Sequence, residues 1–185
     1  KYTIWIAKNQ LNEKVKSILA SLDFNCLDST PGMKLDLTNY RPATDPSMHD
    51  IRVVTSAEDL QSYARLIADQ WKPRDENVIS YYHRISGMIL ENKLPIQFAL
   101  YFKNGAPVAG VEMCITTDTM GIYGLATLES YRKQGIGTAL TNYTLACAKT
   151  KNLGATVLQS SDSGYGIYKR LGFKVMTEYF EYGRK

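Results

Sequence analysis

The stretch with the clearest chemical potential is YRKQGIGTAL, residues 131–140, which combines basic side chains with two closely spaced glycines. It follows an apolar run, GIYGLATL at 121–128, and precedes an amphipathic pattern. A strand, a glycine turn and a helix start in this order make an anion-binding site, because the first amides of a helix lack intrahelical partners. Glycines let the backbone approach a bulky anion, and the helix dipole adds about half a positive charge. The sequence therefore predicts a diphosphate site here.

The spacing inside this loop argues against two common nucleotide motifs. A Walker loop needs a lysine directly after its last glycine, but Gly137 is followed by Thr138 and Ala139. A dinucleotide fingerprint needs a third glycine where Leu140 stands. A nucleotide-binding switch protein is disfavoured for the same reason.

Two motifs resemble those of the GNAT superfamily of N-acetyltransferases. The Arg-x-x-Gly-x-Gly pattern from Arg132 to Gly137 resembles the acetyl-CoA-binding loop of that family, whose backbone amides cradle the CoA pyrophosphate. The Tyr-x-x-Leu-Gly-Phe pattern from Tyr168 to Phe173 resembles its second hallmark, and the two occur in the family's order. The resemblance implies the GNAT acyl-CoA N-acyltransferase fold, an α/β (α+β) architecture with a mixed, mostly antiparallel sheet flanked by helices.

The resemblance also implies which residues bind acetyl-CoA as co-substrate. The pyrophosphate is expected on the loop amides, with the pantetheine beside the preceding strand. Arg132 and Lys133 are expected to add charge-assisted contacts with the phosphates. The alternative is that both side chains belong to a solvated basic turn. The family often has Asn shortly before its tyrosine-containing helix, and this chain has Ser161 in that region. The predicted donor-binding residues are Leu125, Ala126, Thr127, Arg132, Lys133, Gln134, Gly135, Ile136, Gly137, Thr138, Ser161 and Tyr168.

Acetyl transfer needs a neutral amine, a polarised carbonyl and an acid for the departing thiolate. The resemblance places Tyr168 where the family has the tyrosine that donates a hydrogen bond or proton to the CoA sulfur. Tyr165 is the substitute, and simple packing is the alternative role of Tyr168. Glu112 stands in an otherwise apolar strand and is the candidate base, directly or through water. A solvent-facing strand residue is the alternative for Glu112, and a water chain could replace a single base. Backbone amides near 125–127 are expected to form the oxyanion site.

Composition excludes several classes of protein. The 185 residues are 44% hydrophobic, enough to bury the core of one domain, with or without an appendage. The three scattered cysteines and two histidines predict no metal, and they favour a cytoplasmic protein with reduced thiols. Net charge is +4 without a dense basic tract, so no nucleic-acid partner is expected. No apolar run approaches the ~20 residues of a membrane helix, and the first residues lack a secretory signal.

Domain boundaries follow from one polar stretch. Residues 39–50, NYRPATDPSMHD, hold two prolines and are the predicted linker, which leaves 51–185 as the GNAT domain. Residues 1–50 are then an N-terminal extension. Residues 21–24 (SLDF) end a predicted helix as 170–173 (RLGF) do, so this extension is interpreted either as the remnant of a degenerate GNAT module or as an ordinary covering segment.

The elements expected around these sites follow from hydrophobic periodicity and turn signals. A capping box is expected at 55–58, a hairpin turn at Asn104–Gly105, and a further turn at Pro31–Gly32. Helices are predicted at 12–22, 55–71, 77–91, after the glycine loop and at 163–173. Strands are predicted at 2–7, 24–28, 33–37, 51–55, 95–102, 106–116, 122–128, 155–161 and 174–182.

Two functions are compatible with these observations. The first is an acetyl-CoA-dependent N-acetyltransferase that acts on an amine of a small molecule or peptide, as a monomer or homodimer. The second is a noncatalytic acyl-CoA-binding regulatory module. Fold analogy does not identify the acceptor. The aromatic stretch of Tyr81, Tyr82 and His83 is expected either to pack as helix core and surface or to line an acceptor pocket.

Overall fold

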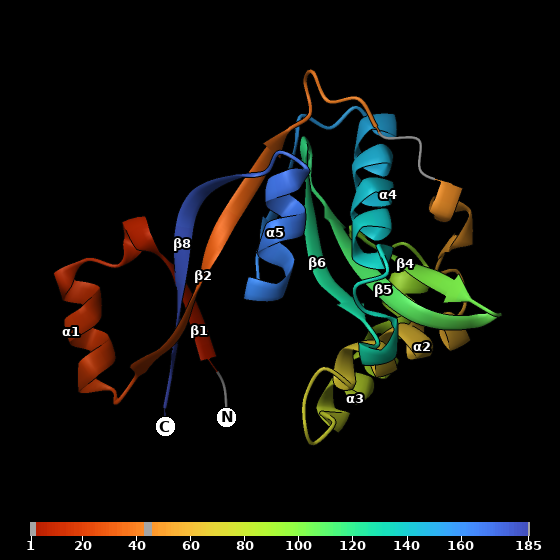
Figure 1. Ribbon diagram of the computed structural model, residues 1–185. Helices are drawn as coiled ribbons and strands as arrows, with labels where there is room; N and C mark the ends of the chain where they lie inside the picture. Colours follow the sequence, from red (N-terminus) through yellow and green to blue (C-terminus); the bar gives the residue numbers. More distant parts are fainter. Residues whose placement is uncertain (1–2, 43–45, 185) are drawn as a thin grey trace. The chain divides into compact units, whose positions relative to one another are not determined.

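The computed structural model describes residues 3–42 and 46–184, which form an α+β fold with mostly antiparallel strands (Figure 1). Its strands are β1 Thr3–Ala7, β2 Asn25–Asp36, β3 Ile51–Val53, β4 Ile96–Lys103, β5 Ala106–Ile115, β6 Thr119–Thr127, β7 Ala155–Gln159 and β8 Lys174–Gly183. Its helices are α1 Glu13–Ser21, α2 Ala57–Ala68, α3 Glu76–Leu90, α4 Ile136–Thr150 and α5 Asp162–Arg170, with short 3-10 turns η1 Lys8–Gln10, η2 Pro46–Asp50 and η3 Glu129–Tyr131.

The chain divides into two compact units. Unit 1 contains residues 1–35 and 157–185, and unit 2 contains Asp36–Thr156. Of the predicted linker, residues 43–45 lie outside the described residues, and 46–50 form η2. The division into an extension and a domain at residue 50 stays a prediction.

Unit 2 is built on four antiparallel strands in the order β6-β5-β4-β3. The predicted hairpin between β4 and β5 is confirmed: Asn104 and Gly105 have φ of 52° and 79°, the left-handed pair that a tight hairpin turn requires. Helices α2 and α3 pack together on the sheet over a buried cluster. This core consists of Val54, Leu60, Tyr63, Ala64, Leu66, Tyr82, Ile89, Phe98 and Leu100.

Helix α2 starts one residue later than its predicted cap. The side chain of Ser56, not Thr55, accepts a hydrogen bond of 3.1 Å from the N–H of Asp59. Ser56 has the extended backbone of a capping residue, with φ of −125°, and its hydroxyl reaches the third helical amide. The capping box predicted at 55–58 is therefore wrong by one position.

Unit 1 orders its strands β1-β8-β2, with antiparallel pairing on both sides of β8. The turn predicted at Pro31–Gly32 is wrong, because β2 runs through both residues. Gly32 is needed for close packing rather than for a turn: a Cβ there would lie 2.7 Å from a ring carbon of Tyr179. The carbonyl of Pro31 accepts a hydrogen bond of 3.0 Å from the N–H of Ser160.

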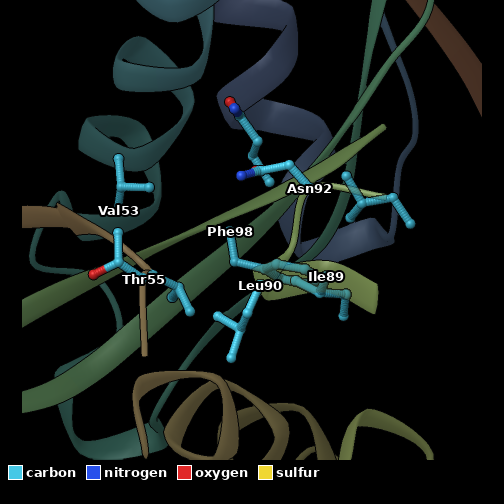
Figure 2. A pocket seen from close by; sticks show the side chains of 9 residues that line it. Val53, Thr55, Ile89, Leu90, Asn92 and Phe98 are labelled. Carbon is cyan, nitrogen blue, oxygen red and sulfur yellow. The ribbon is translucent and has the colours of Figure 1, made fainter. Parts of the chain in front are cut away.

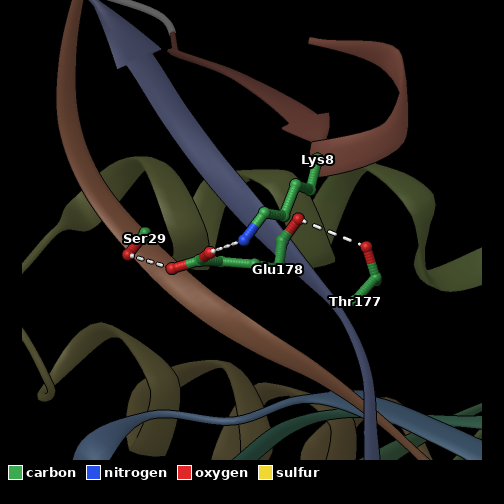
Figure 3. A network of polar contacts seen from close by, with 4 residues as sticks. All are labelled: Lys8, Ser29, Thr177 and Glu178. Carbon is green, nitrogen blue, oxygen red and sulfur yellow. Dashed lines mark hydrogen bonds and ion pairs between the residues drawn. The ribbon is translucent and has the colours of Figure 1, made fainter.

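A small polar network joins three segments of unit 1 (Figure 3). Lys8 forms an ion pair of 3.3 Å with Glu178 of β8, and Ser29 of β2 donates a hydrogen bond of 3.2 Å to the same carboxylate. The hydroxyl of Thr177 donates to the carbonyl of Glu178 at 3.4 Å. Since this network is largely exposed, it aligns the strands more than it stabilises them.

Candidate functional site

The glycine loop joins η3 to α4 in unit 2 and leaves the start of that helix uncapped. Gly135 is the residue before α4, has a left-handed φ of 83°, and offers no side-chain cap. The first intrahelical bond runs from the N–H of Ala139 to Gly135, at 2.9 Å. The amides of residues 136–138 therefore lack intrahelical acceptors. A Cβ on Gly135 would meet nothing within 4 Å, so there is open space beside the residue that precedes these amides.

The side chain of Arg132 braces this loop. Its Nε donates a hydrogen bond of 3.1 Å to the carbonyl of Thr127, and its Nη2 donates one of 2.9 Å to Gln70 beyond the end of α2. Two of its five donors are thus used within the protein. A contact of Arg132 with phosphate stays a prediction. Local sequence patterns did not indicate Gln70, because the contact joins residues far apart in the chain.

Gln134 is also held from a distance. Its Oε1 accepts a hydrogen bond of 2.6 Å from the Nζ of Lys103 in β4, and its Nε2 donates to the carbonyl of Ser130 at 3.2 Å. The Lys103 ammonium also lies 5.8 Å from the ring centre of Tyr131. Lys103 and the exposed Lys133 place positive charge around the loop. From the sequence alone, this charge is expected only from the loop residues.

The strand before the loop carries a β-bulge. Gly110 of β5 pairs with Ala126, but Glu112 pairs with Tyr123, so two residues of β6 lie opposite one of β5. One of the two is Gly124, with a left-handed φ of 48° and a carbonyl that accepts a hydrogen bond of 3.1 Å from Tyr63. A bulge takes backbone groups out of the regular ladder. The bulge therefore lies where the predicted segment Leu125–Thr127 begins.

Glu112 has a specific partner. The hydroxyl of Tyr82, on α3, donates a hydrogen bond of 2.7 Å to its Oε2. Partial burial raises the pKa of the Glu112 carboxyl, and the hydrogen bond from Tyr82 opposes that rise. Glu112 is half-buried in this network, which disfavours the alternative of a solvent-facing strand residue.

The aromatic rings around Glu112 come from three elements. The Tyr82 ring makes edge-to-face contacts with Tyr63 of α2 and Phe98 of β4, with centroids 5.4 and 5.7 Å apart. Burial and the nearby carboxylate raise the pKa of Tyr82 far above its ordinary value, so it remains a hydrogen-bond donor. Tyr82 is buried, whereas its neighbours Tyr81 and His83 are exposed. The stretch thus includes core and surface, as one of the two interpretations predicted.

The remaining predicted residues lie in unit 1, at the start and near the end of α5. Ser161 is the N-cap of α5, and its hydroxyl accepts a hydrogen bond of 3.3 Å from the N–H of Gly164. Tyr168 is 8% exposed, and its ring contacts Phe173 edge-to-face at 5.7 Å. Burial raises the pKa of Tyr168 to about 12. Among the described residues, none forms a hydrogen bond with its hydroxyl.

Unit 2 also contains a small hollow of about 130 Å³ between β3, β4 and the end of α3 (Figure 2). None of the predicted donor-binding or catalytic residues lines it. Its lining residues are Val53, Val54, Thr55, Ile89, Leu90, Asn92, Ile96, Gln97 and Phe98. We assign it no role in the site.

Metal-ligand clusters and membrane-spanning helices are both absent from the part of the chain that the structure describes. In residues 3–42 and 46–184, no group of three or more His, Cys, Asp or Glu side chains is placed to hold a metal ion. Over the same residues, every helix is too short or too polar to cross a membrane. The three cysteines are free thiols.

Comparisons with known proteins identify a similar domain and similar folds. Residues 95–175 match the family model described as an acetyltransferase (GNAT) domain, whereas no curated protein matches the sequence. A GCN5-related N-acetyltransferase from Kribbella flavida is similar in structure, with a TM-score of 0.71 and 20% identity over 98% of this chain and 67% of its own. Residues 95–175 thus match a GNAT acetyltransferase domain, and the solved structure shares the GNAT fold with this chain.

Two other similar solved structures differ in how much of this chain they cover. An acetyltransferase from Trypanosoma brucei has a TM-score of 0.58 and 21% identity over 68% of this chain and 92% of its own. A tandem GNAT protein from the clavulanic acid biosynthesis pathway has a TM-score of 0.68 and 14% identity over 97% of this chain. The present chain spans 62% of that tandem protein.

Proposed function

We propose that this protein is an acetyl-CoA-dependent N-acetyltransferase that moves an acetyl group to an amine of a small molecule or peptide. The observation that carries the proposal is the uncapped start of α4, where open space lies beside Gly135 and the amides of residues 136–138 lack intrahelical acceptors. An arrangement of this kind suits a diphosphate. CoA contains that group, and the family match covers the loop.

The donor-binding residues follow from this placement. The pyrophosphate is proposed to accept hydrogen bonds from the amides of Ile136, Gly137 and Thr138, with Lys133 and Lys103 contributing positive charge. Arg132 and Gln134 then hold the loop in shape through their partners within the protein. Ser161 is retained as a proposed contact by resemblance alone.

The acyl end of the donor is proposed to lie along residues 125–127 of β6. The β-bulge at Gly124 frees backbone groups at the start of that segment, and the Tyr63 hydroxyl fixes its carbonyl. Backbone amides there are suited to the oxygen of the thioester, since developing negative charge is stabilised by fixed N–H donors.

Glu112 is the proposed base. A carboxylate whose pKa is raised by burial is a stronger proton acceptor than a solvated one, and it can take the ammonium proton of the acceptor directly or through water. Tyr82 keeps the carboxylate oriented and limits the rise of its pKa. The amine would then be neutral when its nitrogen forms the bond to the acetyl carbon.

Tyr168 is the proposed acid for the departing thiolate. With its pKa raised to about 12, its hydroxyl is protonated at neutral pH and can donate to the sulfur. This assignment rests on the Tyr-x-x-Leu-Gly-Phe resemblance. We also propose an amine as the acceptor, a monomeric or homodimeric state, and a cytoplasmic location.

Turnover tests the proposal directly. Purified protein is incubated with acetyl-CoA and a library of amines and peptides, and both free CoA thiol and acetylated amine are measured. Amine-dependent thiol release with a matching acetylated product supports it, and Glu112→Gln is expected to lower the rate. Tight acetyl-CoA binding without release for any amine would favour the noncatalytic acyl-CoA-binding module instead.

A further inference from the structure

Helices α1 and α5 of unit 1 match residue for residue. Both have nine residues, and each position of α1 has its counterpart 149 positions later, as Glu13 and Asp162 show. Their caps match as well. The side chain of Asn12 accepts from the N–H of Val15, and the side chain of Ser161, 149 positions after Asn12, accepts from the counterpart amide.

The ends of the two helices repeat the same correspondence. Each ends in a left-handed residue followed by a buried phenylalanine, whose N–H bonds back to the carbonyl five residues earlier. The bond runs from Phe24 to Leu19 at 2.9 Å and from Phe173 to Tyr168 at 3.0 Å. The left-handed residues are Asp23 and Gly172, with φ of 59° and 95°. Sequence alone predicted only a faint likeness of these ends.

The strands that follow these helices pair about an approximate two-fold axis. Thr30 of β2 lies opposite Tyr179 of β8, which is its own counterpart. On either side of that pair, Ser29 lies opposite Phe180 and Pro31 opposite Glu178, and the same shift of 149 exchanges these two pairs. The remaining pairs, out to Asn25↔Gly183 and Lys34↔Lys174, exchange in the same way.

Even the irregularities of this pairing obey the symmetry. The register shifts once between Cys26 and Asp28, where β2 has the extra residue Leu27. It shifts back beside Gly32, where β8 has the extra residue Met176, and Leu27 and Met176 are counterparts. Both side chains are exposed, at 42% and 65%. A coincidence of helix, cap and two bulges at one constant shift would require several independent accidents.

We propose that residues 12–34, the first copy, and residues 161–183, the second copy, are two copies of one segment, and that β8 carries an edge fitted to a two-fold related copy of its own segment. Residues 12–34 of the same chain occupy that edge. Figure 1 shows the helices of the two copies, α1 and α5, on either side of the β2–β8 pair. The edge of β8 therefore pairs with a copy of its own segment, and that copy belongs to the same chain.

The first copy has lost the chemistry of the second. Leu19 stands at the position of Tyr168, and both are buried, at 6% and 8%. Lys16 stands at the position of Tyr165 and pairs with Glu13 instead. Residues 12–34 therefore lack both tyrosine hydroxyls of residues 161–183. Their role is to cover the edge of β8.

Gly32 adapts the first copy to this role. Its counterpart in β8 is Glu181, and any Cβ at position 32 would press against Tyr179 and Thr177. A second β8 strand would bring a glutamate to that place. Gly32 thus favours β2 of the same chain over another copy of β8.

A graft tests the correspondence in the full chain. Residues 12–24 are replaced by the sequence of 161–173 in one variant and by that of 162–174 in a matched control, which has nearly the same composition but is shifted by one residue. The shift puts lysines at the buried positions 19 and 24 and phenylalanine at the left-handed position 23. The control should therefore fail where the in-register graft succeeds.

Both grafts also carry Thr30→Cys, Tyr179→Cys and Cys26→Ser. Directly paired residues of antiparallel strands lie within disulfide range, so the disulfide between positions 30 and 179 reports correct pairing of β2 with β8. We expect the in-register graft to form it as fully as the ungrafted chain, and to melt about 10 °C or more above the shifted graft. Equal melting of the two grafts, or no disulfide in the in-register graft, would overturn the proposal.

Discussion

The hydroxyl of Tyr82 lies 2.7 Å from Oε2 of Glu112 and donates a hydrogen bond to it, which joins α3 to β5 inside unit 2. This contact explains how a carboxylate is tolerated in the apolar strand VAGVEMCI. It also sets the pKa of the proposed base, because burial raises that pKa and the hydrogen bond lowers it.

Tyr82→Phe is expected to move the pH profile of kcat/KM. Without the hydrogen bond the pKa of Glu112 rises further, so the ascending limb shifts to higher pH, because a hydrogen bond to the carboxylate favours its ionised form. Activity should recover at high pH. Tyr81→Phe, at an exposed neighbour, is the control. An unshifted limb in Tyr82→Phe would exclude Glu112 as the titrating base.

Glu112→Gln is expected to separate activity from stability. Because folding raises the pKa of Glu112, its favourable contribution is complete below the unfolded pKa, near 4.5, and is lost as pH rises through the folded pKa. Glutamine can still accept from Tyr82 but does not ionise. The urea midpoint of the variant should therefore gain on that of wild type between pH 4 and pH 8, while turnover falls. A constant difference across that range would contradict this assignment.

The predictable parts of the structure were the local ones. The Asn104–Gly105 turn, the left-handed Gly135 before α4 and Gly172 after α5 all follow from backbone preferences that a few residues determine. The turn predicted at Pro31–Gly32 failed because the glycine serves packing against Tyr179, a residue 147 positions away. Local rules contain no information about such a contact.

The site shows the same division. Spacing alone located the glycine loop, whereas its bracing by Gln70 and Lys103 depends on where α2 and β4 lie. Glu112 drew attention as a charge in an apolar strand, but its partner Tyr82 is 30 residues earlier. The correspondence between α1 and α5 was weak in sequence because only Ile18, Leu22 and Phe24 are identical to their counterparts over 13–34.

Gly124→Ala is expected to be strongly destabilising. The residue has a left-handed φ of 48°, and a Cβ would run into the hydroxyl of Tyr63. Strain and loss of the Tyr63 hydrogen bond together should lower the free energy of unfolding by about 2–4 kcal/mol. Combining it with Tyr63→Phe should cost less than the sum of the two single changes, because the clash is then relieved. Simple additivity in urea unfolding would count against this contact.

Tyr168→Phe is expected to reduce turnover and leave stability unchanged. Its hydroxyl has no hydrogen-bond partner among the described residues, so its removal breaks no contact there. If the hydroxyl donates to the departing thiolate, kcat should fall by about 100-fold or more with unaltered affinity for acetyl-CoA. Tyr165→Phe is the control on the same helix. An equal effect of both changes, or parallel loss of binding and stability, would assign Tyr168 to packing.

The placement of the diphosphate is tested most directly by calorimetric titration of acetyl-CoA into wild type, Gly135→Glu and Gly87→Glu. Gly135→Glu places a negative side chain before the amides of residues 136–138, whereas Gly87→Glu makes the same change at an exposed, unobstructed position on α3. We predict binding to wild type and Gly87→Glu, and a loss of at least about 100-fold in the folded Gly135→Glu protein. Equal affinity in all three proteins would contradict the placement of the diphosphate at the start of α4.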